Sequence, residues 1–145
     1  AMKGGVYMPF EVIHGGRAEL KAEAVVFETK YKPKSGFSKS LRKFFIGDET
    51  ELSPGMARIT ASKSPLSQFE IEVSVPDWNV SGARDALAQC YANAISLARE
   101  FECRSIAFPL LGVRSGAPSD EARKIAERVI DIALLHDDIK ITLSV

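Results

Sequence analysis

The sequence predicts a three-layer α/β/α sandwich around a mixed central sheet, and three observations lead to that prediction. Strand-like and helix-like segments alternate along the chain. Two long segments carry an apolar stripe at helical spacing. An apolar run over 105–111 has no polar face, which is typical of a strand buried inside a sheet. Helices between buried strands imply a sheet that is covered on both faces.

Length and composition indicate one domain. A chain of 145 residues with 46% hydrophobic and 26% charged residues is typical of a soluble globular protein. We expect a single domain over 1–145, with Ala1 and Met2 as an expression remnant; excision from a larger protein stays open. No stretch approaches the roughly 20 apolar residues of a membrane helix, and no signal peptide opens the chain. We therefore expect no membrane partner and a cytoplasmic location.

Periodicity and turn residues place the elements in order. Strands are expected over 6–14, 24–28, 57–62, 69–75, 105–111 and 139–145, and helices over 38–47, 81–101 and 120–135. Pro9 makes the first strand an edge or bulged strand. The alternation over 69–75 favours a half-exposed, antiparallel strand. Ser38 and Ser81 are the expected N-caps of the first two helices.

The two longer helices have defined inner faces. The helix over 81–101 is expected to bury Leu87, Tyr91, Ala94, Ile95, Ala98 and Phe101. The helix over 120–135 is expected to bury Ala122, Ile125, Ala126, Val129, Ile132 and Ala133. Cys90 and Cys103 lack the spacing of metal ligands, so we expect two buried small apolar residues in a reducing compartment.

The loop after the strand over 105–111 is the most informative segment. We call it the second loop, and it consists of Gly112, Val113, Arg114, Ser115 and Gly116. Pro118 then opens the last helix. Ligands of open α/β sheets bind at such strand-to-helix turns, where backbone N–H groups favour anions such as phosphates. An ordinary connection without a ligand is the alternative.

A basic segment precedes the middle of the chain. Between Thr29 and Gly47 there is no acidic residue, and the basic residues are Lys30, Lys32, Lys34, Lys39, Arg42 and Lys43. This segment is either a solvated surface or an electropositive rim that attracts a phosphate-bearing ligand or nucleic acid. The formal net charge of zero argues against bulk nucleic-acid affinity. His14 and His136 have no ligands at metal spacing, so we expect neither a metal nor a cofactor.

Six segments carry motifs whose order is informative. They lie at 15–27, 36–47, 55–60, 73–78, 90–93 and 105–118, and include a Gly-x-Ala-x-Ile-Thr signature at 55–60 and a Cys-Tyr-x-Asn core at 90–93. Together they resemble the macro domain, an ADP-ribose-binding α/β module, over nearly the whole chain. The resemblance implies a nucleotide cleft between the second loop and a first loop that follows the strand over 24–28.

Departures from the family pattern fall in that implied cleft. Gly16 stands where the family has the aspartate that accepts hydrogen bonds from the adenine amino group. Phe27 and Lys30 stand near the family's first-loop asparagines, and neither has an amide that could orient a ribose hydroxyl or a water. The glycine run is shortened to 34–36, although lysines could partly replace its phosphate contacts. Arg114 stands where the family prefers small or aromatic residues.

The resemblance therefore implies a weak, non-catalytic binding module for ADP-ribose or a related phosphate-bearing nucleotide. Besides the second loop, the expected ligand-binding residues are Gly15, Gly16, Phe27, Lys34, Ser35, Gly36 and Phe37. No residue is expected to be catalytic; Glu28 is the lone acid near the cleft, and a strand-end surface carboxylate is its other interpretation. Two alternatives stay open: a degenerate scaffold that binds a protein partner, and an atypical ADP-ribosyl hydrolase.

Overall fold

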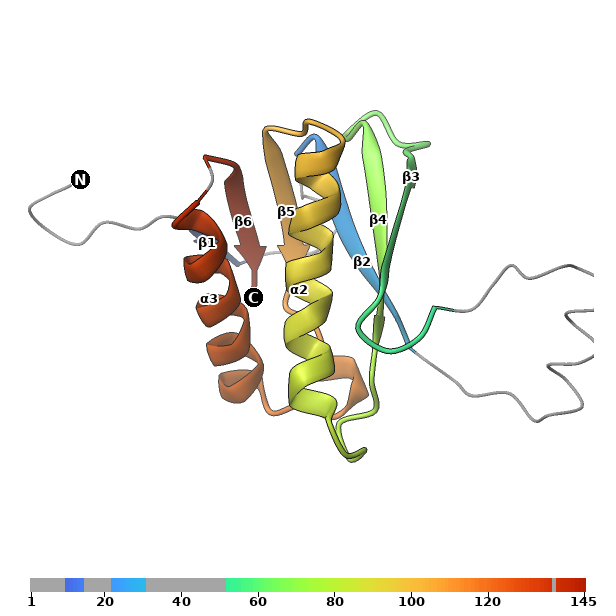
Figure 1. Ribbon diagram of the computed structural model, residues 1–145, viewed down its shortest axis with the longest axis vertical. Coiled ribbons are helices and arrows are strands. Elements are labelled where there is room, and N and C mark those ends of the chain that lie inside the picture. The colour runs from blue at the N-terminus through green and yellow to red at the C-terminus, as the bar shows by residue number, and fades with distance from the viewer. Residues whose placement is uncertain (1–9, 15–21, 31–51, 137) are drawn as a thin grey trace, which may run out of the picture.

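The computed structural model describes residues 10–14, 22–30, 52–136 and 138–145. In chain order the elements are β1 Glu11–Ile13, β2 Ala24–Lys30, β3 Ala57–Ala61, β4 Phe69–Val75, α2 Ala83–Glu100, β5 Ser105–Pro109, the 3-10 turn η2 Val113–Ser115, α3 Ser119–Leu134 and β6 Lys140–Ser144. Figure 1 shows both α-helices in front of one sheet.

The six strands form one mixed sheet in the order β1-β6-β5-β2-β4-β3. Only β3 and β4 are antiparallel to each other; the remaining neighbours are parallel. The mixed sheet is therefore confirmed. The strand over 69–75 is antiparallel to β3 but parallel to β2, so the expectation of an antiparallel strand holds on one side only.

The described helices make one layer on one face of the sheet, and α2 and α3 pack side by side on it (Figure 1). The helix expected over 38–47 lies outside the described residues. The predicted α/β class is confirmed by this arrangement. Within the described residues, no helix has both the length and the apolar composition needed to cross a membrane.

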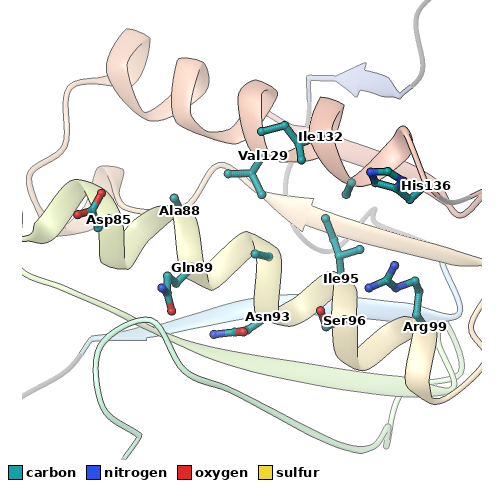
Figure 2. Close-up of a pocket in the computed structure, with 12 residues that line it drawn as sticks. Asp85, Ala88, Gln89, Asn93, Ile95, Ser96, Arg99, Val129, Ile132 and His136 are labelled. Atoms are coloured by element: carbon teal, nitrogen blue, oxygen red, sulfur yellow. The ribbon is translucent and has the colours of Figure 1, made fainter.

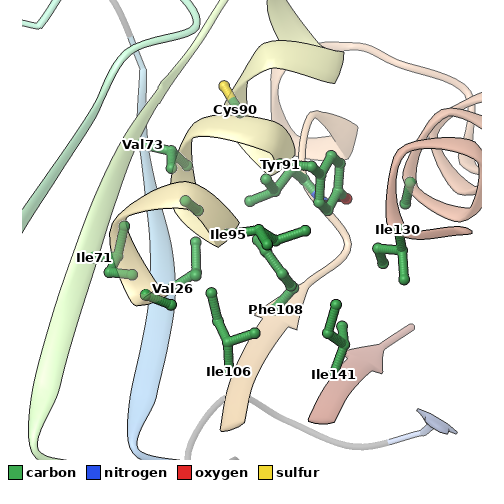
Figure 3. Close-up of a cluster of buried hydrophobic side chains, with 14 of the residues drawn as sticks. Val26, Ile71, Val73, Cys90, Tyr91, Ile95, Ile106, Phe108, Ile130 and Ile141 are labelled. Carbon is green, nitrogen blue, oxygen red and sulfur yellow. Dashed lines mark hydrogen bonds between the residues drawn. The ribbon is translucent and has the colours of Figure 1, made fainter. Parts of the chain in front are cut away.

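The core fills the space between the helices and the sheet (Figure 3). Alternate residues of the strands point to the helices, so Val26, Ile71, Ile106 and Ile141 are fully buried. On α2, Tyr91 contributes the largest fully buried side chain, and its ring lies 5.0 Å from that of Phe108 between centroids. Cys90 and Cys103 are buried free thiols, as expected.

The start of α2 differs from the prediction. Ser81 is not the N-cap: the helix begins at Ala83 after Gly82, whose φ of 83° is left-handed, and no side chain caps it. The chain enters the helix through a backbone conformation that a glycine adopts without strain, and this displaces the expected serine cap. The strand over 105–111 is also shorter than predicted, because Leu110 and Leu111 already belong to the turn.

Two residues expected inside are exposed. Ile132 is 56% exposed because α3 buries Ala122, Ala126 and Ile130, and a residue two positions after Ile130 lies about 200° around the helix. Phe101 is 45% exposed because it ends α2 as the C-cap, where its ring packs edge-on against Phe69.

Truncation of Phe108 tests this core. Phe108 is fully buried, so Phe108→Ala leaves a cavity and should lower the free energy of unfolding by roughly 3–5 kcal/mol. Phe101→Ala is the matched control at an exposed ring and should cost clearly less. Urea unfolding measures both variants, and equal losses would contradict the burial described above.

Candidate functional site

The candidate site lies where β2 and β5 end. These strands are parallel neighbours, so their carboxyl ends meet at one edge of the sheet. Glu28 comes from the end of β2, and the second loop follows β5 after Leu110 and Leu111. The two segments are joined by a hydrogen bond, in which the Gly112 N–H donates to Glu28 Oε1 at 3.0 Å.

One turn of α2 fastens the surrounding segments. Tyr91 Oη accepts a hydrogen bond from the Leu111 N–H at 2.9 Å, and this bond is buried. The Cys90 thiol donates to the Ser74 carbonyl at 3.2 Å, and Asn93 Nδ2 donates to the Gly55 carbonyl at 2.7 Å. The Cys-Tyr-x-Asn core therefore ties the second loop, the end of β4 and the turn before β3 to one helix.

The second loop is a closed turn held by its own backbone. Gly112 has a left-handed φ of 94°, and the 3-10 turn Val113–Ser115 follows it. The Gly112 carbonyl accepts hydrogen bonds from the N–H groups of Ser115 at 3.0 Å and Ala117 at 3.1 Å. The Trp78 N–H donates to the Ser115 carbonyl at 3.0 Å, which attaches the loop to the segment after β4.

The side chain of Trp78, whose backbone N–H bonds to the second loop, is itself held by a cation–π contact. The Arg84 guanidinium lies 4.8 Å from the centroid of the Trp78 ring and also pairs with Glu121 of α3. Trp78 thus packs beneath a cation while its backbone holds the loop.

The loop presents a row of backbone donors. A left-handed residue followed by a right-handed turn makes a concave nest, in which successive N–H groups point toward the same side and attract an anion. Here those groups belong to Gly112, Val113 and Arg114. The Gly112 N–H bonds to Glu28, and among the hydrogen bonds between described residues none uses the N–H of Val113 or Arg114.

Glu28 brings a negative charge to this nest. Neighbouring residues of a strand point to opposite faces, so Glu28 lies on the helix side with Ala24 and Val26 and is half-buried. Burial raises the pKa of the Cys90 thiol to about 12, and the Glu28 charge adds to that rise. Burial likewise raises the pKa of Tyr91, with a smaller contribution from Glu28. Both groups stay neutral beside the carboxylate at neutral pH.

The predicted site residues fall into three groups. In the second loop, Val113 and Arg114 are exposed while Ser115 is buried. Phe27 is half-buried on the face of β2 opposite to Glu28, because its strand neighbour occupies the helix face. The remaining predicted residues, and the side chains of the basic segment, lie outside what the structure describes: Gly15, Gly16, Lys34, Ser35, Gly36 and Phe37.

Three side chains that support the site were not in the predicted set. They are Tyr91 under Leu111, Leu87 under Gly112 and Trp78 beside Ser115. Tyr91 is the one with a local signal, since a buried tyrosine needs a partner for its hydroxyl. Glu28 was noted as a lone acid but not as a partner of the loop.

A groove of about 670 Å³ lies elsewhere, between α2 and α3 (Figure 2). Apolar residues such as Ile95, Val129 and Ile132 line its middle, with Asp85 toward one end and Arg99 and His136 toward the other. Apart from that of Asp85, in the first turn of α2, the backbone N–H groups along its walls bond to carbonyls of the same helix. The groove therefore has no donor row of the kind that the second loop presents.

In the part of the chain that the structure describes, no group of three or more His, Cys, Asp or Glu side chains is placed so that it could hold a metal ion.

Comparison with known proteins identifies relatives by sequence. A model of the macro domain family matches residues 37–126, which is more than half of the chain. A macro domain-containing protein of Chlorobaculum tepidum is 37% identical over 75 residues, covering 50% of this chain and 44% of that protein. A macro domain-containing protein of Methanosarcina mazei is 30% identical over 92 residues, which cover 61% of this chain and 49% of that protein. The chain spans about half the length of these curated relatives.

Solved structures share the fold. The Oceanobacillus iheyensis macrodomain with ADP gives a TM-score of 0.74 at 24% identity, covering 92% of this chain and 80% of that chain. The Trypanosoma brucei macrodomain in complex with ADP gives a TM-score of 0.74 at 18% identity, and the match covers 92% of this chain and 62% of that chain. The expected macro-domain-like architecture is confirmed.

Two glycines test the geometry of the second loop. A Cβ at Gly112 would lie 2.9 Å from Leu87 Cδ2, whereas a Cβ at Gly82 would meet nothing within 4 Å; both positions have a positive φ. Gly82→Ala should therefore lower the free energy of unfolding by about 1–2 kcal/mol, from backbone strain alone. Gly112→Ala should lower the free energy of unfolding by roughly 1–3 kcal/mol more than Gly82→Ala does, because the new methyl group would overpack against Leu87. Urea unfolding of both variants measures the difference, and equal losses would show that Leu87 does not restrict the loop.

The buried thiol predicts how stability changes in alkali. The pKa of Cys90 rises from its ordinary 9.0 to about 12 on folding, so above pH 9 the unfolded chain binds fewer protons than the folded one. The free energy of unfolding should be unaffected by this group below pH 9. It should then fall by up to about 1.4 kcal/mol per pH unit as the pH rises toward 12. Urea unfolding of the wild type and of Cys90→Ala at about pH 8 and about pH 10.5 isolates the effect. The same pH dependence in both proteins would exclude it.

Proposed function

Because the chain belongs to the macro domain family, we propose that it binds ADP-ribose or a related phosphate-bearing nucleotide at the second loop. The observation that carries the proposal is the concave row of N–H groups from Gly112 to Arg114 at the carboxyl ends of parallel strands. Macrodomains of Oceanobacillus iheyensis and Trypanosoma brucei with ADP support a nucleotide as the ligand class.

The residues at the loop suit an anion with several oxygens. The N–H groups of Val113 and Arg114 can each donate to a phosphate oxygen, and the exposed Arg114 side chain can add a charged, bidentate contact. Ser115 is buried and holds the turn rather than offering its side chain to a ligand. Phosphate recognition in this proposal therefore relies on the backbone donors of the second loop and on the side chains of Arg114, Lys30 or Lys34.

Binding is weak in this proposal because the adenine and ribose ends have lost polar partners. Glycine at position 16 has no side-chain acceptor, and a hydrogen bond of this kind contributes about 0.5–1.5 kcal/mol net. Phenylalanine at position 27 cannot orient a hydroxyl or a water. The phosphate contacts must then supply most of the affinity.

The protein is non-catalytic in this proposal. Hydrolysis needs a group that orients and activates a water. Glu28 is the acid beside the loop, and its Oε1 is engaged by the Gly112 N–H. A hydrogen-bonded, half-buried carboxylate that holds a turn is a structural partner rather than a free base.

Calorimetric titration with ADP-ribose tests the binding proposal. We expect weak binding that falls with added salt, because exposed charges are screened over about 10 Å at 0.1 M ionic strength. Arg114→Ala should weaken binding and reduce the salt dependence. Arg104→Ala, at the amino end of β5 and 91% exposed, should leave both unchanged. Tight, salt-insensitive binding would contradict a phosphate-based site, and no binding to any nucleotide at low salt would favour the scaffold alternative.

An assay with ADP-ribosylated protein tests the absence of catalysis. We expect no release of ADP-ribose, because the Glu28 carboxylate beside the second loop already accepts the Gly112 N–H. Release that is lost in Glu28→Gln would overturn this expectation and support the hydrolase alternative. Release that persists in that variant would point to a catalytic group elsewhere.

A further inference from the structure

We propose that Glu28 is an internal anion that competes with a phosphate for the Gly112 N–H, and so determines which ligands the second loop accepts. This inference rests on the proposed function, since it concerns the same loop. It assigns to Glu28 a role in specificity rather than in chemistry.

The contact between Glu28 and the loop is built into the fold. Glu28 and Gly112 are 84 positions apart, and the parallel pairing of β2 with β5 brings them together. The direction of the Gly112 N–H is fixed on both sides. Leu87 lies directly under Gly112, and the preceding Leu111 N–H is held by the buried Tyr91 hydroxyl. The N–H cannot turn away from the carboxylate without loss of these contacts.

The carboxylate occupies a donor that a phosphate in the nest would use. A nest binds an anion through successive N–H groups, and here the first of the three already has an acceptor with a full negative charge. A phosphate that bonds to Val113 and Arg114 would lie a few ångströms from Glu28. Two anions at that separation repel each other strongly in a half-buried site.

Among the described residues, the ion pairs join Arg58 to Glu72, Arg84 to Glu121, Arg104 to Glu23 and Arg123 to Glu127, and none includes Glu28. The repulsion between the Glu28 carboxylate and a ligand grows with the negative charge of the ligand. The loop with Glu28 in place disfavours a pyrophosphate more than a ligand with a single phosphate charge.

The variant Glu28→Gln tests the effect of the negative charge separately from the effect of the side chain's size and shape. Glutamine keeps an oxygen that can accept the Gly112 N–H, so the loop should keep its geometry while the negative charge disappears. Calorimetric titrations of the wild type and of this variant with ADP-ribose and with inorganic pyrophosphate measure the effect. We expect Glu28→Gln to bind both ligands about tenfold more tightly, or better, than the wild type.

Glu100→Gln is the matched control. It removes the same charge at an exposed position at the other end of α2, and it should leave the affinity unchanged. An equal gain in Glu100→Gln would overturn the inference, because net charge alone would then explain the result. The amide resonance of Gly112 in the wild type gives a second measurement that needs no variant: it should shift on addition of pyrophosphate as the carboxylate is displaced.

The outcomes distinguish this inference from the proposed function. Binding to the wild type with no gain, or a loss, in Glu28→Gln would overturn the competition and leave nucleotide binding intact. Binding without any shift of the Gly112 amide would do the same. If neither protein binds ADP-ribose or pyrophosphate, both the proposed function and the inference fail.

Discussion

The hydrogen bond from the Leu111 N–H to the Tyr91 hydroxyl is the interaction on which the rest of the site depends. It lies in the core, beside the packed rings of Tyr91 and Phe108, where water cannot replace a lost partner. It lies two residues beyond the end of β5 and holds the chain where it leaves the sheet. Gly112 and the donor row after it take their positions from that point, and Cys90 and Asn93 extend the same helical turn to two further segments. Tyr91 thus links the hydrophobic core to the second loop.

Much of the fold could be predicted because periodicity records burial directly. The alternation over 69–75 gave the bounds of β4 without error, and the apolar stripes located α2 and α3 to within two residues at each end. The errors have a common physical cause. Leu110 and Leu111 are apolar because a turn is buried there, not because the strand continues, and Ser81 resembles a cap although Gly82 provides the turn. Local chemistry does not distinguish such cases, since tertiary contacts decide them.

The candidate site could be predicted only in part. A glycine loop after a buried strand has a local signature, and the second loop was identified from it. The contact between Glu28 and Gly112 has no local signature in the sequence, because it arises from the order of the strands in the sheet. The residues near Glu28 in the chain do not indicate which strand lies beside β2. The family resemblance implied a cleft between two loops but not this contact. Single residues that meet across a sheet remain the part of a site that sequence patterns describe least well.

The carboxylate beside the second loop also affects how ligands would exchange there. The turn is formed and bonded from within the chain, through Ser115, Ala117, Trp78 and Glu28, so little ordering entropy would be lost on binding. If Glu28 competes with a phosphate for the Gly112 N–H, arrival of a ligand at this loop also requires that this one glutamate side chain rearrange. Rotamer changes of this kind are far faster than the closure of a loop over a ligand. In the proposed binding mode, the second loop itself would therefore not slow the exchange of a ligand.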